Sequence, residues 1–96
     1  MQQPSFEWDE NKNVINQQKH GVSFEKAQYA LDDPHRVISR DLEHSNDLEE
    51  RFFCFGLVDG RVLTVRFTYR RKRIRIFGAG YWRQGRTHYE QANRLY

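Results

Sequence analysis

The sequence predicts an α+β domain, because a short strand and two helices come first, a run of strands follows, and a helix ends the chain. The chain has 96 residues and a mass of 11.7 kDa, which suits one domain, residues 1–96, with one modest core. Aromatic residues make up 15% of it, too many for a disordered chain. We expect the order β-α-α-β-β-β-α, with an antiparallel sheet, two N-terminal helices on one face and a C-terminal helix.

The first strand and the first helix are predicted at the N-terminus. Residues 5–8 can form a short strand. Asp9 is a suitable N-cap for a helix over residues 10–20, whose last turn is basic. Gly21 follows that turn and can end the helix in the left-handed conformation.

A second helix is predicted over residues 24–31. Ser23 can cap it, and its apolar residues recur at helical spacing. The Asp33-Pro34 step lies beyond its end, and the residue before a proline is disfavoured in the α conformation.

Two hairpins dominate the second half of the chain. The dipeptide Asp59-Gly60 is a strong hairpin signal and separates predicted strands over residues 51–58 and 61–69. A basic turn at Arg71-Lys72 separates the latter from a strand over residues 73–79.

Three further segments surround these hairpins. Residues 36–40 can form a strand, and a polar, acidic loop over residues 41–50 follows it. The final helix is expected over about residues 86–95, since Gly85 disfavours an earlier start.

Two-residue turns fix which side chains lie opposite each other. The first turn pairs Phe53 with Arg66 and Phe52 with Phe67, and the second pairs Thr68 with Arg75 and Arg66 with Phe77. Alternation then directs one set of side chains toward a core. That set is Phe52, Cys54, Leu63, Val65, Phe67, Tyr69, Ile74 and Ile76. The opposite face receives Phe53, Phe55, Thr64, Arg66, Thr68, Arg70, Arg73, Arg75 and Phe77.

The charge is distributed unevenly along the chain. Residues 1–50 hold 5 basic and 11 acidic side chains, whereas residues 51–96 hold 11 basic and 2 acidic ones. Arginine binds phosphate bidentately and stacks on bases, and the exposed phenylalanines add stacking surfaces. The face therefore predicts binding of single-stranded RNA. In the alternative interpretation, the phenylalanines form a second small core under a loop and the arginines surround it.

The candidate chemistry depends on histidine and lysine. RNA cleavage can use the 2′-hydroxyl of the substrate, while arginines stabilise the charge on phosphorus. Lys19 and His20, or Tyr81 and His88, could transfer the protons. His20 could equally be a simple cation at a helix end.

No cofactor or metal is expected. The four histidines show no metal-ligand spacing on one element, and a single cysteine, Cys54, excludes an intramolecular disulfide. A polar N-terminus and the lack of a long apolar run lead us to expect a cytoplasmic protein without a membrane span.

Several motifs resemble BrnT-type toxins. These motifs are Phe6-Glu7-Trp8-Asp9, the run Lys19-His20-Gly21-Val22-Ser23-Phe24-Glu25-Lys26-Ala27, Asp33-Pro34, Glu49-Glu50-Arg51-Phe52, Gly56 and Arg73-Ile74-Arg75-Ile76. The recurring polar residues of the family match Trp8, Asp9, Lys19, His20, Glu50, Arg51 and Arg75.

The resemblance implies a ribonuclease toxin of a type II toxin–antitoxin pair, with a RelE-like fold. It also implies RNA as substrate and a BrnA-type antitoxin with a ribbon-helix-helix part, whose complex with the toxin binds operator DNA. The chain departs from the family where it reads Gly78-Ala79-Gly80 in place of Ser-Ala-Arg. Arg83, or Arg66 across the sheet, could replace the missing arginine.

We therefore predict an endoribonuclease without a metal or cofactor. The predicted catalytic residues are Lys19, His20, Arg66 and Arg75. The predicted nucleic-acid contacts are Arg51, Phe53, Arg70, Arg73, Phe77 and Arg83. The alternatives are a non-catalytic nucleic-acid-binding module, a catalytically weakened homologue, and a protein-binding partner whose exposed phenylalanines form an interface.

Overall fold

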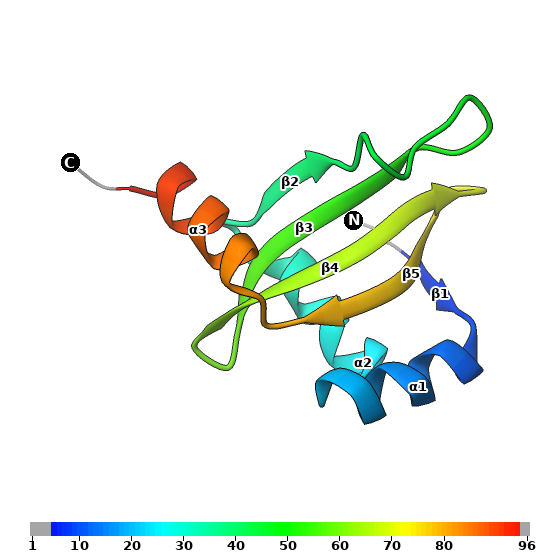
Figure 1. Cartoon of the computed structure of the whole chain (residues 1–96), viewed down its shortest axis with the longest axis horizontal. Helices are drawn as coiled ribbons and strands as arrows, with labels where there is room; N and C mark the ends of the chain where they lie inside the picture. The colour runs from blue at the N-terminus through cyan, green and yellow to red at the C-terminus, as the bar shows by residue number, and fades with distance from the viewer. Residues whose placement is uncertain (1–4, 95–96) are drawn as a thin grey trace.

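A computed structural model describes residues 5–94 and contains one five-stranded sheet with the strand order β1-β5-β4-β3-β2. In Figure 1, α3 lies in front of the sheet, whereas α2 and the 3₁₀ helix η1 lie behind it. The elements are β1 (Ser5–Trp8), α1 (Glu10–His20), α2 (Phe24–Ala27), η1 (Gln28–Asp32), β2 (Val37–Arg40), β3 (Arg51–Val58), β4 (Arg61–Arg70), β5 (Arg73–Gly80) and α3 (Arg83–Ala92).

The predicted α+β class is confirmed, and every segment expected as a strand forms one. The sheet therefore has five strands, one more than the expected order β-α-α-β-β-β-α contains. The four strands β2 to β5 pair antiparallel, whereas β1 pairs parallel with β5, Ser5 lying opposite Arg73 and Trp8 opposite Ile76. The sheet is thus mostly antiparallel, with one parallel edge.

The helix boundaries at the N-terminus follow from the predicted caps. The Asp9 carboxylate accepts hydrogen bonds from the backbone N–H groups of Asn11 and Lys12, at 2.8 and 3.3 Å. Gly21 adopts φ 70° at the end of α1, and its N–H donates to the Gln17 carbonyl. The Ser23 hydroxyl accepts from the Lys26 N–H at the start of α2.

The second helix differs from the prediction of one α-helix over residues 24–31. It is α-helical only to Ala27 and then tightens into the 3₁₀ helix η1. At η1 the backbone of Ala30 lies so close to Gly56 of β3 that a side chain at Gly56 would overlap the Ala30 carbonyl. Asp33, before Pro34, is extended with ψ 120°, as expected of that position.

The last helix was predicted too late in the chain. It begins at Arg83 rather than Arg86, and Gly85 lies inside it. Gly85 is required there because a Cβ atom would overlap the Thr64 hydroxyl and meet the Phe55 ring at 2.9 Å. The glycine therefore permits close packing of α3 on the sheet, which outweighs its low helix propensity. The predicted end of the helix, residue 95, lies outside the described residues.

The predicted register is confirmed for both hairpins except at one point. Phe53 lies opposite Arg66 and Thr68 opposite Arg75, as expected. Arg66, however, lies opposite Gly78 and not Phe77, because a β-bulge shifts the pairing between Arg66 and Phe67. Phe77 is the extra residue of the bulge.

The main core lies between the sheet and the helices α2 and η1. Of the side chains predicted for it, Tyr69 is 55% exposed and only contacts its edge, while Phe52 is half-buried. The buried members are Val22, Phe24, Ala27, Ala30, Leu31, Cys54, Val58, Leu63, Val65, Phe67, Ile74, Ile76 and Ala79.

A second, smaller core lies on the opposite face of the sheet, under α3. It comprises Phe55, Val62 and Tyr89, with Val37 and Phe53 packed against it. The alternative of a second phenylalanine core is therefore correct for Phe55, although a helix and not a loop covers it. Phe53 remains half-buried at its margin.

Asp33 connects α3 to the rest of the fold. Its buried carboxylate accepts hydrogen bonds from the Tyr89 hydroxyl at 2.7 Å and from the Leu57 N–H at 2.8 Å. Burial raises the pKa of Asp33, but the bonds from Leu57, Tyr89 and His35 outweigh burial and lower it below its ordinary value. Burial and the bond to Asp33 raise the pKa of Tyr89 to about 12.

None of the helices within residues 5–94 combines the length and apolar character that a membrane span requires.

Replacing Gly85 with alanine is expected to lower the free energy of unfolding by about 1–3 kcal/mol, because the methyl group overpacks the contact with Thr64 and Phe55. Urea denaturation measures the change. Gln91→Ala, at an exposed position of the same helix, is the matched control and should change stability by less than about 0.5 kcal/mol. Equal stability of both variants would show that α3 does not pack as described.

Replacing Tyr89 with phenylalanine is expected to cost about 1.5–3 kcal/mol at pH 7, because a hydrogen bond to a buried carboxylate is lost. The lowered pKa of Asp33 means that its bonds stabilise the fold above the unfolded pKa of about 3.9, and that this stabilisation is lost as the pH falls further. The difference between wild type and Tyr89→Phe should therefore shrink below about pH 4. Denaturant titrations between pH 3 and 7 test this, with Tyr69→Phe at an exposed tyrosine as control.

Candidate nucleic-acid interface

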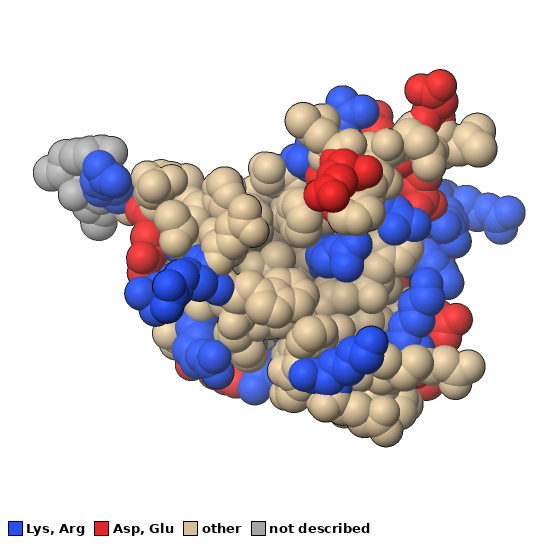
Figure 2. Space-filling model, viewed as in Figure 1, with Lys and Arg blue, Asp and Glu red and all other residues tan. Residues whose placement is uncertain are grey.

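The face of the sheet that α3 partly covers carries the predicted arginines and phenylalanines. We define the basic face as Arg51 and Phe53 on β3, Arg66 on β4, and Arg75 and Phe77 on β5. All five are half-buried, so each exposes part of its side chain to solvent. Figure 2, viewed from the same side as Figure 1, shows Lys and Arg at the centre and edges of this surface, with Asp and Glu gathered near the loop before β3.

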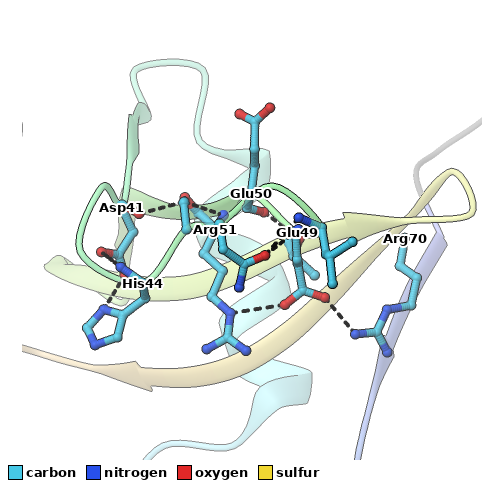
Figure 3. A network of polar contacts seen from close by, with 10 residues as sticks. Asp41, His44, Glu49, Glu50, Arg51 and Arg70 are labelled. Atoms are coloured by element: carbon cyan, nitrogen blue, oxygen red, sulfur yellow. Dashed lines mark hydrogen bonds and ion pairs between the residues drawn. The ribbon is translucent and has the colours of Figure 1, made fainter.

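Two carboxylates neutralise much of the positive charge at the strand ends. Glu49 pairs with Arg51 at 3.0 Å and with Arg70 at 2.7 Å (Figure 3). Hydrogen bonds from Arg70 and then from Arg51 hold the pKa of Glu49 below its ordinary value, although burial raises it. Figure 3 also shows the loop that positions Glu49, in which His44 contacts the buried Asp41 carboxylate at 2.9 Å.

Glu7 of the edge strand β1 likewise pairs with two arginines, on the neighbouring strand β5. Its carboxylate lies 3.0 Å from Arg75 and 3.5 Å from Arg73. The hydrogen bond from Arg75, followed by the one from Arg73, lowers the pKa of Glu7. Of the predicted catalytic residues, Arg75 is therefore on the expected face but is already paired with a carboxylate.

Arg66 differs from these arginines. Within residues 5–94 it has no ion-pair partner, although it lies at the centre of the basic face. Its neighbours across the two strand pairs are Phe53 and Gly78. Gly78 leaves room beside it, since a Cβ atom there would lie 3.8 Å from the Arg66 Cδ atom. Arg66 is thus the arginine of this face that is free to bind an anion.

The ring of Phe77, at the bulge, makes cation–π contacts with two basic side chains. The Arg51 guanidinium lies 4.4 Å from the centre of its ring, and the Lys12 ammonium of α1 lies 5.8 Å from it. Lys12 was not predicted, because the helix pattern gives no indication that its first turn borders β5. The positive charge of Lys12 is the one feature of the sequence that could have suggested a place for it on the basic face.

The end of α1 places His20 beside the start of α3. The His20 ring contacts the Trp82 ring edge to face, with 5.2 Å between centroids. Lys19 and His20 are both exposed. The sequence separation between residues 20 and 82 explains why the contact could not be predicted.

Trp82 also fills the space beside Gly80, where the resemblance led us to expect an arginine. A Cβ atom at Gly80 would lie 2.5 Å from the Trp82 ring, so the indole occupies the space of a side chain at position 80. Gly80 lies opposite Thr64, which is two residues before Arg66 on the same face of β4. The chain therefore has a tryptophan where an arginine at position 80 would extend.

Arg83 follows Trp82 and is exposed at the start of α3. It lines a groove of about 480 Å³ together with Arg61, Tyr81 and Arg86. Arg61 covers the Tyr81 ring at 4.0 Å. Arg83 and Tyr81 therefore belong to a separate groove at the end of the sheet and not to the centre of the basic face.

Three residues of the family motif have visible structural roles. Asp9 caps α1, and the Trp8 ring meets Phe24 of the core edge to face at 6.1 Å. Glu50 pairs with Arg40 at 3.2 Å, and its backbone carbonyl accepts a hydrogen bond from the buried Thr68 hydroxyl.

The described residues include neither a reactive thiol nor a cluster of metal ligands. Burial raises the pKa of Cys54 to about 12, so this thiol is a core residue and not a nucleophile. Among the residues that the structure describes, no group of three or more His, Cys, Asp or Glu side chains is arranged to hold a metal ion.

Comparison with known proteins identifies the family. No curated protein matches the sequence closely enough to report. Residues 8–85, however, match the family described as the ribonuclease toxin, BrnT, of type II toxin–antitoxin systems. This match covers most of the chain, including every strand of the basic face. The chain therefore belongs to the BrnT family of ribonuclease toxins.

Proposed function

We propose that this toxin cleaves RNA at the basic face without a metal, with the 2′-hydroxyl of the substrate as nucleophile. The observation that carries the proposal is Arg66, a half-buried guanidinium without an ion-pair partner in the described chain, beside the half-buried ring of Phe53. An arginine in this setting can bind a phosphate through two hydrogen bonds while the ring stacks on a base.

The reaction requires charge stabilisation and two proton transfers. The 2′-oxygen attacks phosphorus and the bond from phosphorus to the 5′-oxygen breaks, which leaves a 2′,3′-cyclic phosphate and a 5′-hydroxyl. The proton of the 2′-hydroxyl passes to a base, and the departing oxygen takes up a proton. Arg66 would stabilise the negative charge that develops on the phosphate oxygens.

His20 and Lys19 are the proposed proton-transfer residues. His20 contacts Trp82, Trp82 covers Gly80, and Gly80 pairs with Thr64 near Arg66. This series of contacts links His20 to the end of the sheet face that carries Arg66, and we propose that His20 reaches a phosphate bound there. A histidine can act as base or acid near neutral pH.

The paired arginines have a different proposed role. Arg51, Arg70, Arg73 and Arg75 share the carboxylates of Glu7 and Glu49, so they would bind RNA phosphates by exchange with these carboxylates or through their remaining N–H donors. We propose that Arg75 makes this exchange beside the scissile phosphate and that the others bind the RNA backbone on either side. Phe53 and Phe77 would stack on bases.

The proposed partner is a cognate BrnA-type antitoxin with a ribbon-helix-helix part, in a complex that binds operator DNA. Membership of a type II family supports a protein antitoxin. Coexpression with a small protein encoded next to this chain, followed by copurification and recovery of growth, would test the pairing.

A second candidate function is a nucleic-acid-binding toxin homologue with weakened cleavage. The glycine at position 80 and the pairing of Arg75 with Glu7 favour it, because both reduce the positive charge available to a phosphate. This candidate predicts salt-dependent RNA binding without cleavage.

Replacing Arg66 with alanine is expected to reduce the rate of RNA cleavage by about 100- to 1,000-fold, as loss of a charge-stabilising donor does in other enzymes. The slope of the logarithm of RNA affinity against the logarithm of salt concentration should become less steep by about one unit, because one phosphate contact is lost. Single-turnover cleavage of a labelled single-stranded RNA measures the rate, and Arg94→Ala beyond the end of α3 is the matched control. A rate unchanged in Arg66→Ala would contradict the catalytic role.

Replacing His20 with alanine is expected to reduce the cleavage rate by about 100-fold or more and to remove one limb of its pH dependence. RNA binding should change little, because His20 is not among the proposed phosphate contacts. Cleavage rates between pH 5 and 9 provide the measurement. His35→Ala, at an exposed histidine before β2, should retain the wild-type profile. A wild-type pH profile in His20→Ala would exclude this residue as base or acid.

A further inference from the structure

We propose that a cleft between α3 and the sheet binds one pyrimidine base of the RNA, an inference that rests on the proposed function. The cleft has a volume of about 140 Å³ and opens beside the basic face. Its aromatic lining consists of Phe53, Phe55, Trp82 and His88, and its polar lining includes Thr64 and Gln84.

The aromatic residues form a nearly parallel series. His88 stacks on Phe55 with 5.2 Å between centroids and 7° between planes. Phe55 in turn stacks on Phe53 at 5.9 Å and 13°. Phe55 is buried, whereas Phe53 and His88 expose part of their rings. A flat base can extend this series, because aromatic rings and bases attract each other face to face.

The Thr64 hydroxyl supplies an independent indication of a ligand. Thr64 is only 3% exposed, and its hydroxyl oxygen is the buried side-chain polar atom without a hydrogen-bond partner in the described chain. Buried polar groups are nearly always paired, so this one calls for a partner. Thr64 lines the cleft next to Gly85, whose backbone covers the hydroxyl, so a base edge in the cleft would pair with this hydroxyl after a small shift of α3.

The size of the cleft favours a single ring. An apolar cavity of roughly 150 Å³ holds a benzene molecule, so a cleft of about 140 Å³ favours a pyrimidine over the two fused rings of a purine. Gly85 sets this size, because α3 already lies so close to Thr64 and Phe55 that not even a methyl group fits between them.

The cleft also lies next to the proposed phosphate site along β4. Thr64 and Arg66 are two residues apart on the same face of β4, which corresponds to roughly 7 Å along the strand. A base beside Thr64 and a phosphate at Arg66 can therefore belong to neighbouring parts of one RNA strand. Gln84, in the first turn of α3, has an amide that can read the second polar group of the base.

Binding of short oligonucleotides tests the proposal without requiring cleavage. Fluorescence anisotropy would measure the affinity of the full chain for 2′-deoxy oligomers of uracil, cytosine or adenine of equal length. These oligomers lack the 2′-hydroxyl. We expect the uracil or cytosine oligomer to bind at least 10-fold more tightly than the adenine oligomer. Equal affinity for all three, or a preference for adenine, would overturn the inference.

Three variants connect any preference to the cleft. Phe53→Ala, Thr64→Val and Gln84→Ala should each reduce the pyrimidine preference to threefold or less. Tyr29→Ala, which removes an aromatic side chain that is 63% exposed and lines a different cavity, should keep it. Circular dichroism confirms folding of each variant. A preference that persists in all three cleft variants would assign it to another surface and overturn the inference.

The two proposals can fail separately. Cleavage of RNA without any pyrimidine preference would leave the proposed function intact and exclude the base site. A pyrimidine preference that depends on the cleft, in a protein that cleaves no RNA, would support the base site and contradict the proposed nuclease activity.

Discussion

The two tight turns of the β3–β4–β5 meander are the constraint on which the site depends. Both central residues of each turn have a positive φ: 54° and 79° at Asp59 and Gly60, 53° and 65° at Arg71 and Lys72. Turns of this kind match the twist of the strands and allow no extra residue, so they fix the pairing. Because side chains alternate, a slip of one residue would exchange the arginines for the core residues. The core and the basic face are therefore two results of one register.

The β-bulge at Phe77 shifts this register beside Arg66. Without the bulge, Phe77 would lie opposite Arg66 and restrict it. With it, Gly78 takes that position and Phe77 moves into contact with Arg51. Bulges often redirect side chains beside functional sites. Here the bulge separates the cations around the Phe77 ring from Arg66, which lies opposite a glycine and not opposite a ring.

The number of arginines on this surface is larger than the number that lack a carboxylate partner. The second half of the chain is strongly basic, yet Glu7 and Glu49 from the first half pair with four of its arginines. Such pairs contribute little to stability at a surface, because water screens them. They do orient the guanidinium groups, and a phosphate that binds there competes with the carboxylates. Arg66 is therefore the arginine of the basic face that has no carboxylate partner in the described chain.

The sequence by itself determined the α+β class, the helix caps, both hairpins and the division of the sheet into two faces. These features depend on local chemistry: caps, left-handed turn residues and a period of two. Only the tertiary structure decided the tightening of η1, the start of α3 around Gly85, the bulge, and the approach of His20 to Trp82. Each of these involves contacts between residues distant in sequence, which no local pattern encodes. The tertiary structure likewise decided which arginines are free, since a carboxylate from β1 or the loop before β3 selects its partners by proximity.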